Sequence, residues 1–563
     1  SDTVSVTVTE PPQKVSVAGR VYYEFVPPVV SGTRCTGLNF SATEERPIRR
    51  ATVQLLDADN TVIGTTTAAE DGSYAFPDID AGIDVRVRVR AELKKSGAPS
   101  WDVEVRDNVD TSESPAPLKE RPLYVVQWEL FNTGARDIDD ADFTARAGWN
   151  GSTYASTRAA APFAILDAIY DGVELVLSVE PGAALPPLDA FWSVNNKPVS
   201  PTDIDNGELS SSFYSPGQDS LFLLGDSATD TEEFDDHVVM HEWGHYFEDN
   251  FSRSDSIGGQ HFLGESLDLR LAFGEGFGHA IAAMTLDDPQ YCDTGAVDGG
   301  AGSFGFSTET NNSGLQGWFN ELSVATFLYD LWDTDPDGVD TGSLGFAPIY
   351  QTMTGPQANT SAFTTVFSFA AELGNMLTPA EREFLDAQLA RENIDVASLD
   401  IWGDGQTATP LGAENDGRDL LPVYTEIPVG GEIANVCINN DYASTKAVNK
   451  LSDWRYLRFT TPTSGRWQIT AQANPVPPPT TDPLPGPDDP PIRDRSDPDL
   501  YIWRQGSFIT SGRSGEDDVE VIDTSTIPAA TYVIEMQEWR HEDEDAASDF
   551  PDRVCFDLSI VAL

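Results

Sequence analysis

Residues 14–115 alternate apolar and polar positions with a period of two, the pattern of β-strands that bury one face. The runs Val15–Val17, Ala51–Leu55 and Val85–Val89 show it most clearly. Asp-Asn at 59–60 and Asp-Gly at 71–72 supply turn residues between such runs. We therefore predict a β-sandwich over 14–115, preceded by a polar lead-in segment at 1–13.

Between residues 116 and 425 the apolar positions recur at helical spacing instead. Five segments have the length and spacing of helices: 159–176, 235–250, 270–285, 321–332 and 379–391. Pro379 stands in the first turn of the last segment, where a helix tolerates proline. This range is predicted to be a mainly helical domain.

From residue 426 onward, short strand-like runs return at the spacing of a second β-sandwich. They are residues 456–459, 467–470, 500–503, 531–534 and 556–560. Residues 475–491 are rich in Pro and Asp and are predicted to form an exposed loop. The predicted fold class is multidomain α+β, with a mainly helical domain at 116–425 flanked by two all-β sandwich domains, the second at 426–563.

The composition adds a strong acidic excess. The 563 residues include 92 Asp and Glu against 34 Lys and Arg, for a formal net charge of −58. Such a surface repels nucleic acid and anionic membranes, so neither is expected as a partner. No apolar run of 18 or more residues is present, so no transmembrane segment is expected. A signal peptide is predicted to be absent or removed, since the first residues lack its basic and apolar regions.

Lysine is scarce, at 7 of the 34 basic residues. An acid-rich, lysine-poor surface suits a marine or saline exterior, where salt screens its self-repulsion. An acidic bacterial surface protein is the alternative, and we expect a monomer in either case. The four cysteines, at 35, 292, 437 and 555, are too far apart for a zinc ribbon. One or two disulfides of an exported protein are predicted, with Cys437 and Cys555 as the first pair.

Five of the six histidines fall between residues 237 and 279. Among them is the string His241-Glu-Trp-Gly-His245, inside an apolar segment predicted to be a helix. Positions i and i+4 share one helix face, so His241 and His245 can bind one zinc ion. Glu242 can then act as the general base toward a water on the metal.

A catalytic zinc of this kind needs a third protein ligand and leaves its fourth position for water. Phe251 stands where the metzincin class has a histidine, which excludes that class. Two carboxylates remain open. Glu265 follows a glycine-containing loop, whereas Glu275 lies in an apolar run of small residues, 272–284, that can pack closely on the first helix.

The string Gly274-Glu-Gly-Phe277 and the glycine loop before it resemble the fungalysin family of secreted gluzincin metallopeptidases, over roughly residues 220–335. In that family the Glu of this string is the third zinc ligand, which implies this role for Glu275. Glu265 lies at the spacing seen in thermolysin-like families and is the alternative. The resemblance implies a zincin-type catalytic domain at 116–425 with Zn²⁺ as cofactor.

The outer domains resemble accessory modules of secreted bacterial proteins. Residues 50–60 and 71–76 are similar to carboxypeptidase-regulatory-like, or transthyretin-like, modules. Residues 497–502 and 528–534 are similar to the bacterial pre-peptidase C-terminal domain. These resemblances imply sandwiches that bind substrate, stabilise the fold or attach the protein to a cell surface.

The chain departs from the gluzincin pattern at two positions. His279 stands where the thermolysin-like families place an Asp that hydrogen-bonds a zinc histidine, and it is either such a partner or a core residue. Gly317 stands where fungalysins have a His that stabilises the oxyanion. Another donor, such as Tyr329, Tyr246 or an Arg, must then replace it, or catalysis is weaker.

The remaining histidines have less specific settings. His237 lies one turn before His241 and is predicted to be a packed residue or a hydrogen-bond partner of the site rather than a fourth ligand. His261, in the loop between the two helices, either lines the substrate cleft or is exposed to solvent. His541 is predicted to be a surface residue.

An acidic loop follows the helix at 321–332. Asp333, Asp335 and Asp337 alternate there in a spacing that suits Ca²⁺, so a calcium ion is a second candidate cofactor. Leu344 occupies the place of the twelfth-position Glu of an EF-hand, which argues against that motif. In so acidic a chain, an acidic loop without a metal is the alternative.

These features together predict a secreted or outer-surface zinc endopeptidase that acts on proteins or peptides. His241, His245 and Glu275 are the predicted ligands and Glu242 the general base. Two alternatives remain: a non-catalytic surface or adhesion protein with a vestigial zinc site, and a zinc exopeptidase. No Gly-x-Met-Glu-Asn string of aminopeptidases is present, which favours the endopeptidase.

Overall fold

The computed structural model describes residues 13–297, 300–336, 341–410, 419–440, 448–474, 496–515, 518–542 and 550–563. Nearly all of the predicted lead-in segment, the predicted loop at 475–491, and Asp337 lie outside these residues. The chain divides into two compact units, Ser1–Tyr246 with Thr285–Phe306, and Phe247–Met284 with Ser307–Leu563. The predicted three-domain boundaries therefore stay predictions, and each unit is described by itself.

The helices are α1 (Ala161–Val179), α2 (Asp236–Phe251), α3 (Leu269–Leu286), α4 (Glu321–Trp332), α5 (Phe346–Thr354), α6 (Val366–Met376) and α7 (Pro379–Arg391). All five predicted helices are confirmed, with ends within three residues of the prediction. The short helices α5 and α6 were not predicted, because nine and eleven residues give too few turns for a clear periodic signal.

The strands before residue 310 are β1 (Lys14–Phe25), β2 (Pro28–Ser31), β3 (Arg34–Leu38), β4 (Glu44–Pro47), β5 (Ala51–Asp57), β6 (Val62–Thr67), β7 (Ser73–Asp80), β8 (Asp84–Lys95), β9 (Trp101–Arg106), β10 (Val125–Gln127), β11 (Phe131–Asn132), β12 (Phe143–Ala145), β13 (Leu188–Trp192), β14 (Phe213–Ser215), β15 (Ser220–Leu223), β16 (Gln290–Asp293) and β17 (Phe304–Ser307). The predicted strands at 15–17, 51–55 and 85–89 are among them.

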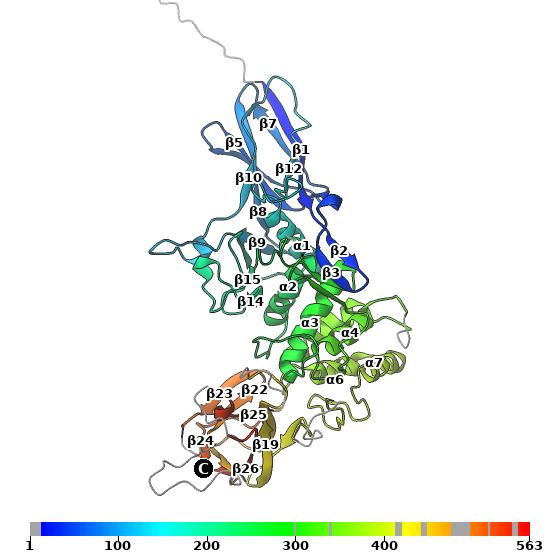
Figure 1. Cartoon of the computed structure of the whole chain (residues 1–563), viewed down its shortest axis with the longest axis vertical. Coiled ribbons are helices and arrows are strands. Elements are labelled where there is room, and N and C mark those ends of the chain that lie inside the picture. The colour runs from blue at the N-terminus through cyan, green and yellow to red at the C-terminus, as the bar shows by residue number, and fades with distance from the viewer. Residues whose placement is uncertain are drawn as a thin grey trace, which may run out of the picture. The chain divides into compact units, whose positions relative to one another are not determined.

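One sheet runs through most of the first unit in the order β14-β15-β13-β9-β8-β5-β6 (Figure 1). Its strands β8 and β5 carry the N-terminal alternating pattern, whereas β13 and β15 come from beyond residue 115. The parallel pairing of β9 with β13 joins the two parts, so one sheet continues across the predicted boundary at 115. Helix α1, apolar along most of its length, packs against β8 and β9.

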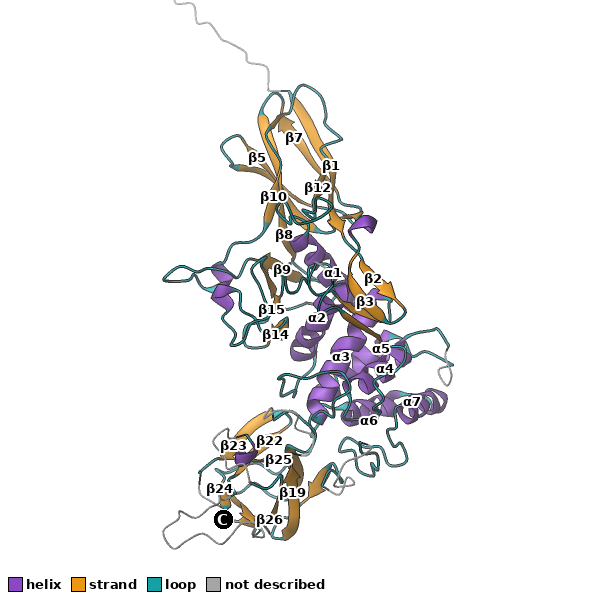
Figure 2. Cartoon of the chain, in the orientation of Figure 1, coloured by secondary structure: helices purple, strands orange, loops and turns teal. Residues whose placement is uncertain are grey.

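The later strands are β18 (Tyr424–Glu426), β19 (Glu432–Asn439), β20 (Trp454–Thr460), β21 (Trp467–Ala473), β22 (Pro498–Arg504), β23 (Ser507–Gly512), β24 (Val519–Asp523), β25 (Thr531–Glu538) and β26 (Arg553–Ala562). They form a five-stranded sheet, β18-β20-β25-β22-β23, and a four-stranded sheet, β19-β26-β21-β24. Apolar side chains of both sheets share one buried core, which includes Phe459, Ile534 and Phe556. The predicted C-terminal β-sandwich is thus confirmed, and its strands are orange in Figure 2.

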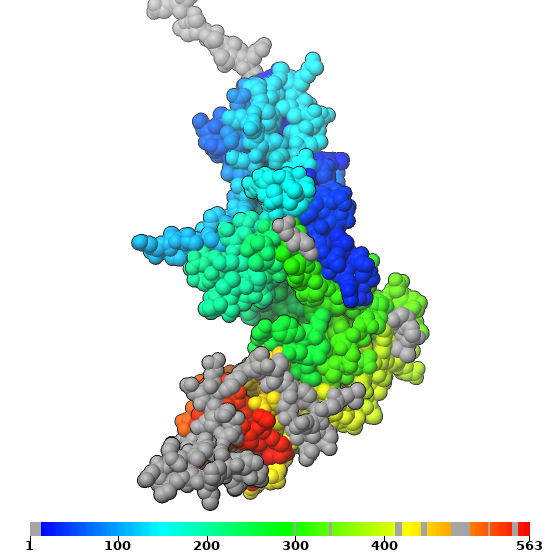
Figure 3. Space-filling model, in the orientation of Figure 1, coloured from blue at the N-terminus to red at the C-terminus, as the bar shows by residue number. Residues whose placement is uncertain are grey.

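Two disulfides are present, Cys35–Cys292 and Cys437–Cys555. The predicted pair is therefore confirmed; it joins the neighbouring strands β19 and β26, in which Cys437 and Cys555 face each other in register. The other bond ties β3 to β16, where Gln290 also donates a hydrogen bond to the Thr33 carbonyl at 3.2 Å. The β2–β3 hairpin is dark blue in Figure 3. Disulfides are typical of proteins in oxidising compartments.

Within the described ranges, none of the helices combines the length and the apolar character that spanning a bilayer requires.

A buried ion network joins α3 to the C-terminal sandwich inside the second unit. Arg270, 3% exposed, donates to Asp268 at 3.0 Å and pairs with Glu535 at 2.7 Å. Tyr456 of β20 also donates to Asp268. Because a buried charge is costly unless it is paired, this network fixes the start of α3 against the sandwich.

We expect Arg270→Met to lower the free energy of unfolding by about 3–5 kcal/mol, since it leaves two buried carboxylates without a cation. Urea denaturation followed by fluorescence measures the change. The control is Arg146→Met, whose exposed pair with Glu24 should contribute about 1 kcal/mol or less. Equal losses in both variants would contradict the assignment.

Candidate metal centre

Helix α2, which carries His241 and His245, is largely buried. Its apolar side chains Val239, Met240 and Trp243 are fully or almost fully buried. Trp243 and Met240 lie so near α1 that a Cβ on Gly172 would be 2.8 Å from both side chains. The tight packing of α1 therefore fixes the rotation of α2 about its axis, and with it the face that carries His241 and His245.

The two imidazoles of the motif converge. Their Nε2 atoms are 3.1 Å apart, and the ring planes are nearly perpendicular at 87°. Two nitrogen ligands of a tetrahedral zinc, each about 2.0–2.1 Å from the metal, lie roughly 3.3 Å apart. The observed separation is close to that value. Glu242, one residue further along α2, is also buried, at 7% exposed.

Helix α3 supplies the carboxylate predicted to complete the set. His241, His245 and Glu275 each offer a ligand atom, and these atoms lie within 4.8 Å of one another. Glu275 is 7% exposed and is flanked by glycines. A Cβ on Gly276 would lie 2.5 Å from Val324 of α4, so only glycine lets α4 approach α3 this closely. Gly276 of the 272–284 run thus serves close packing against α4.

Glu265, the alternative third ligand, takes part in a different set of contacts. Glu265 accepts a hydrogen bond from the Phe262 amide at 2.9 Å and pairs with Lys450 at 2.9 Å. Lys450 is itself 2% exposed, so the pair is a structural link to the loop before β20. In the described part of the chain, Glu265 belongs to none of the groups of side chains that could hold a metal.

His261 lies beside the carboxylates rather than in open solvent. Its Nε2 is 3.3 Å from Glu275 Oε2 and 3.4 Å from Glu321 Oε2, and its Nδ1 is 3.1 Å from the Gly259 carbonyl. Burial lowers the pKa of His261, but the charges of Glu275 and Glu321 outweigh it and raise that pKa to about 10. Of the two predicted settings, the structure favours His261 as a residue of the site.

Glu321 and His279 are two further buried residues near Glu275. Glu321, 1% exposed at the start of α4, lies 3.8 Å from His279 Nε2. His279 is itself buried, on α3 one turn after Glu275. The contacts of Glu321 with two histidines were not predicted from the sequence.

The backbone conformation and the close surroundings of Gly317 both favour glycine at this position. Its φ is +152°, and a Cβ would lie 2.5 Å from the Phe319 ring. A histidine at this position is therefore strained whatever the chemistry requires. Tyr246, one of the suggested substitutes, donates its hydroxyl to the Pro186 carbonyl at 2.7 Å. Tyr329 is buried, with its ring 5.5 Å from that of Trp332 on the same helix.

The outer histidines lie away from the ligand atoms. His237 Nε2 is 3.0 Å from the Asp288 carbonyl, and its ring lies 5.5 Å from that of Tyr291. Burial lowers the pKa of His237, which favours the neutral ring. These contacts fit the predicted packed residue. His541 Nε2 is 3.1 Å from the Pro551 carbonyl in the C-terminal sandwich, where it is partly buried rather than fully exposed.

The predicted calcium loop is described only in part. Asp333 ends α4 and is 5% exposed, and its Oδ2 accepts the Asp335 amide at 3.0 Å. This contact is a local turn. Calcium at Asp333, Asp335 and Asp337 stays a prediction.

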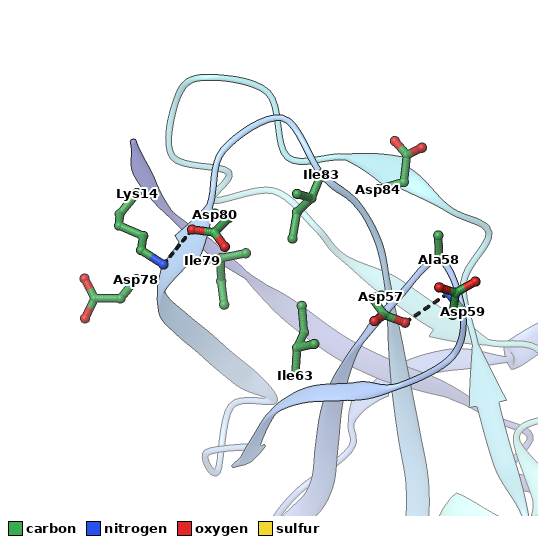
Figure 4. A pocket seen from close by; sticks show the side chains of 10 residues that line it. All are labelled: Lys14, Asp57, Ala58, Asp59, Ile63, Asp78, Ile79, Asp80, Ile83 and Asp84. Atoms are coloured by element: carbon green, nitrogen blue, oxygen red, sulfur yellow. Dashed lines mark hydrogen bonds and ion pairs between the residues drawn. The ribbon is translucent and has the colours of Figure 1, made fainter. Parts of the chain in front are cut away.

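A hollow of about 520 Å³ opens at the end of the N-terminal strands (Figure 4). Its lining includes Asp57, Asp59, Asp78 and Asp84, and Lys14 pairs with Asp80 at 2.6 Å on its rim. No residue of the histidine motif lines this hollow.

Residues 200–378 match the family described as the Mycolysin C-terminal domain. The match covers about a third of the chain and includes His241, Glu242, His245 and Glu275. It supports a protease-related protein.

No curated protein matches the chain. Among solved structures, the pre-peptidase C-terminal domain of a collagenase from Bacillus anthracis is similar at 8% identity, over 24% of this chain and 93% of that one. Its TM-score is 0.15, so this likeness carries no argument here.

Proposed function

We propose that the protein is a secreted zinc metallopeptidase that cleaves internal peptide bonds. The convergence of His241, His245 and Glu275 on one point carries this proposal. Two imidazoles and one carboxylate are the donor set of many catalytic zinc sites, in which a fourth position stays open. The match of residues 200–378 to the Mycolysin C-terminal domain and the two disulfides are consistent with a secreted peptidase.

The donor chemistry fits zinc better than a hard cation, because imidazole nitrogen suits zinc and calcium prefers oxygen alone. A zinc ion held by these three residues supplies Lewis acidity toward a carbonyl and lowers the pKa of water beside it. Glu242, adjacent to His241, takes the proton of the attacking water and later donates it to the leaving amine. The glycine-packed α3 and α4 hold the ligand carboxylate in place.

His261 supplies a positive charge at the site, where Gly317 offers no side chain. Its Nε2 lies 3.3 Å from the ligand carboxylate, on a loop and with a quarter of its side chain exposed. Glu321 faces the same Nε2 and helps to keep the ring oriented and protonated. The positive charge of the protonated ring in this position stabilises the negative charge that develops on the substrate oxygen.

The primary test is peptide hydrolysis by the zinc-loaded protein and by Glu242→Gln. Removing the general base should lower kcat about 10²–10⁴-fold, with zinc content unchanged. Glu383→Gln, an exposed glutamate on α7, is the matched control and should keep wild-type activity. Wild-type protein that binds one zinc and is as inert as Glu242→Gln would favour the non-catalytic alternative.

Metal analysis separates the two candidates for the third ligand. Glu275→Ala should lower zinc affinity by more than the roughly 10–100-fold that follows loss of a group hydrogen-bonded to a ligand. Glu265→Ala should keep zinc, because its carboxylate pairs with Lys450. Loss of zinc only in Glu265→Ala would show that Glu275 is the wrong choice.

The role of His261 is tested with His261→Gln. We expect kcat to fall about 10²–10³-fold while KM and zinc content change little, because the positive charge of the ring acts on the transition state. His541→Gln, in the C-terminal sandwich, is the distant control. A rise in KM with kcat unchanged would assign His261 to substrate binding instead.

A further inference from the structure

Three carboxylates outside the histidine site lie together in the first unit. Asp230, Glu232 and Asp293 each offer an oxygen, and these atoms are within 4.8 Å of one another. Asp230 and Glu232 stand just before α2, and Asp293 ends β16, in the segment that follows α3. Residues about sixty positions apart in the chain therefore bring three negative charges into one place.

The group contains buried oxygens with no hydrogen-bond partner. Glu232 is 2% exposed, and its Oε2 has no donor, while its Oε1 accepts only from Ser212 Oγ at 3.2 Å. Asp230 Oδ1 is likewise buried without a donor. Among the described residues, no Lys or Arg forms an ion pair with Asp230, Glu232 or Asp293. The nearby Arg158 pairs at 2.7 Å with Glu233 instead.

The backbone holds the two segments rigidly together. Asp230 and Gly295 form an antiparallel bridge. Asp235 Oδ2 accepts from both the amide and the hydroxyl of Thr294, at 2.7 and 2.8 Å. The Cys35–Cys292 disulfide anchors the neighbouring residue of β16. The two segments that carry the three carboxylates are therefore held next to each other.

Repulsion and burial both disfavour the charged state of the group. Burial, and then the charges of Asp293 and Asp230, raise the pKa of Glu232 well above its usual range. Burial also raises the pKa of Asp230 to about 6 and that of Asp293 well above normal. A native arrangement that buries unpaired carboxylates needs either protons or a cation.

We propose that Asp230, Glu232 and Asp293 bind a calcium ion that fixes the entry to α2. The donors are all oxygens, as calcium prefers, and no imidazole or thiolate is among them. Calcium ligands at 2.3–2.6 Å can lie up to about 5 Å apart across the ion, which accommodates atoms within 4.8 Å of one another. The octahedral Mg²⁺ site, with ligands at about 2.0–2.1 Å, is narrower and retains more water.

Such an ion joins the segment before α2 to the segment after α3. Asp235 links these two segments to α2, because its carbonyl accepts hydrogen bonds from the amides of Val238 and Val239 in the first turn of that helix. Calcium therefore orders the start of the helix that carries His241, without contacting the imidazoles. This role is independent of the proposed peptidase activity.

The test is calcium titration of protein stripped of metal and reloaded with one equivalent of zinc. Calorimetry in moderate salt should detect one calcium equivalent, and calcium should raise Tm by roughly 3–6 °C. Glu232→Gln should lose that equivalent and the Tm rise. Asp287→Asn, an exposed carboxylate after α3 whose φ of 52° asparagine tolerates, is the matched control and should keep both.

The order of stabilities provides a second readout. Without calcium, Glu232→Gln should be at least as stable as the wild type, because it removes a buried repelling charge. With calcium the order should reverse. If calcium leaves the wild-type Tm unchanged, or raises that of Glu232→Gln equally, the group is a cluster of protonated acids and the calcium site is wrong. Zinc content and peptide hydrolysis, measured on the same samples, show separately whether the proposed peptidase fails.

Discussion

A carboxylate removed from water needs a cation or several hydrogen-bond donors, and this chain buries many carboxylates around α2, α3 and the strands next to them. Several of these carboxylates have a buried arginine as partner. Arg270 neutralises Asp268 and Glu535, and Arg158 neutralises Glu233. Where no guanidinium lies close to a buried carboxylate, a metal ion or a proton can compensate its charge. The proposed zinc and calcium ions are two answers to this constraint.

Close packing between helices fixes the positions of the side chains that make up these sites. Gly172 lets α1 lie on Met240 and Trp243 of α2, and Gly276 lets α4 lie on α3. A Cβ at Gly172 would lie 2.8 Å from Met240 and Trp243, and one at Gly276 would lie 2.5 Å from Val324, so a helix would have to move to make room for either. Since zinc affinity depends on donors placed to within a few tenths of an ångström, these glycines support the chemistry as much as the ligands do.

Prediction from sequence succeeded where the signal was local. The helices at 235–250 and 270–285 and the C-terminal strands were predicted because their apolar periodicity is long and regular. The pair Cys437–Cys555 followed from their places at the two ends of one predicted sandwich. The short α6 was missed for want of turns, and the sheet that continues past residue 115 was missed because parallel pairing of β9 with β13 leaves no mark on either strand's own pattern.

The sequence by itself determined the spacing of His241, Glu242 and His245, since three residues on one helix have a geometry set by 3.6 residues per turn. It also narrowed the third ligand to Glu265 or Glu275. Only the tertiary structure placed Lys450 against Glu265, His261 against Glu275 and Glu321, and Asp293 beside Asp230 and Glu232. Those contacts join separate segments of the chain. Their energies depend on burial and on neighbouring charges, which are set only once the chain has folded.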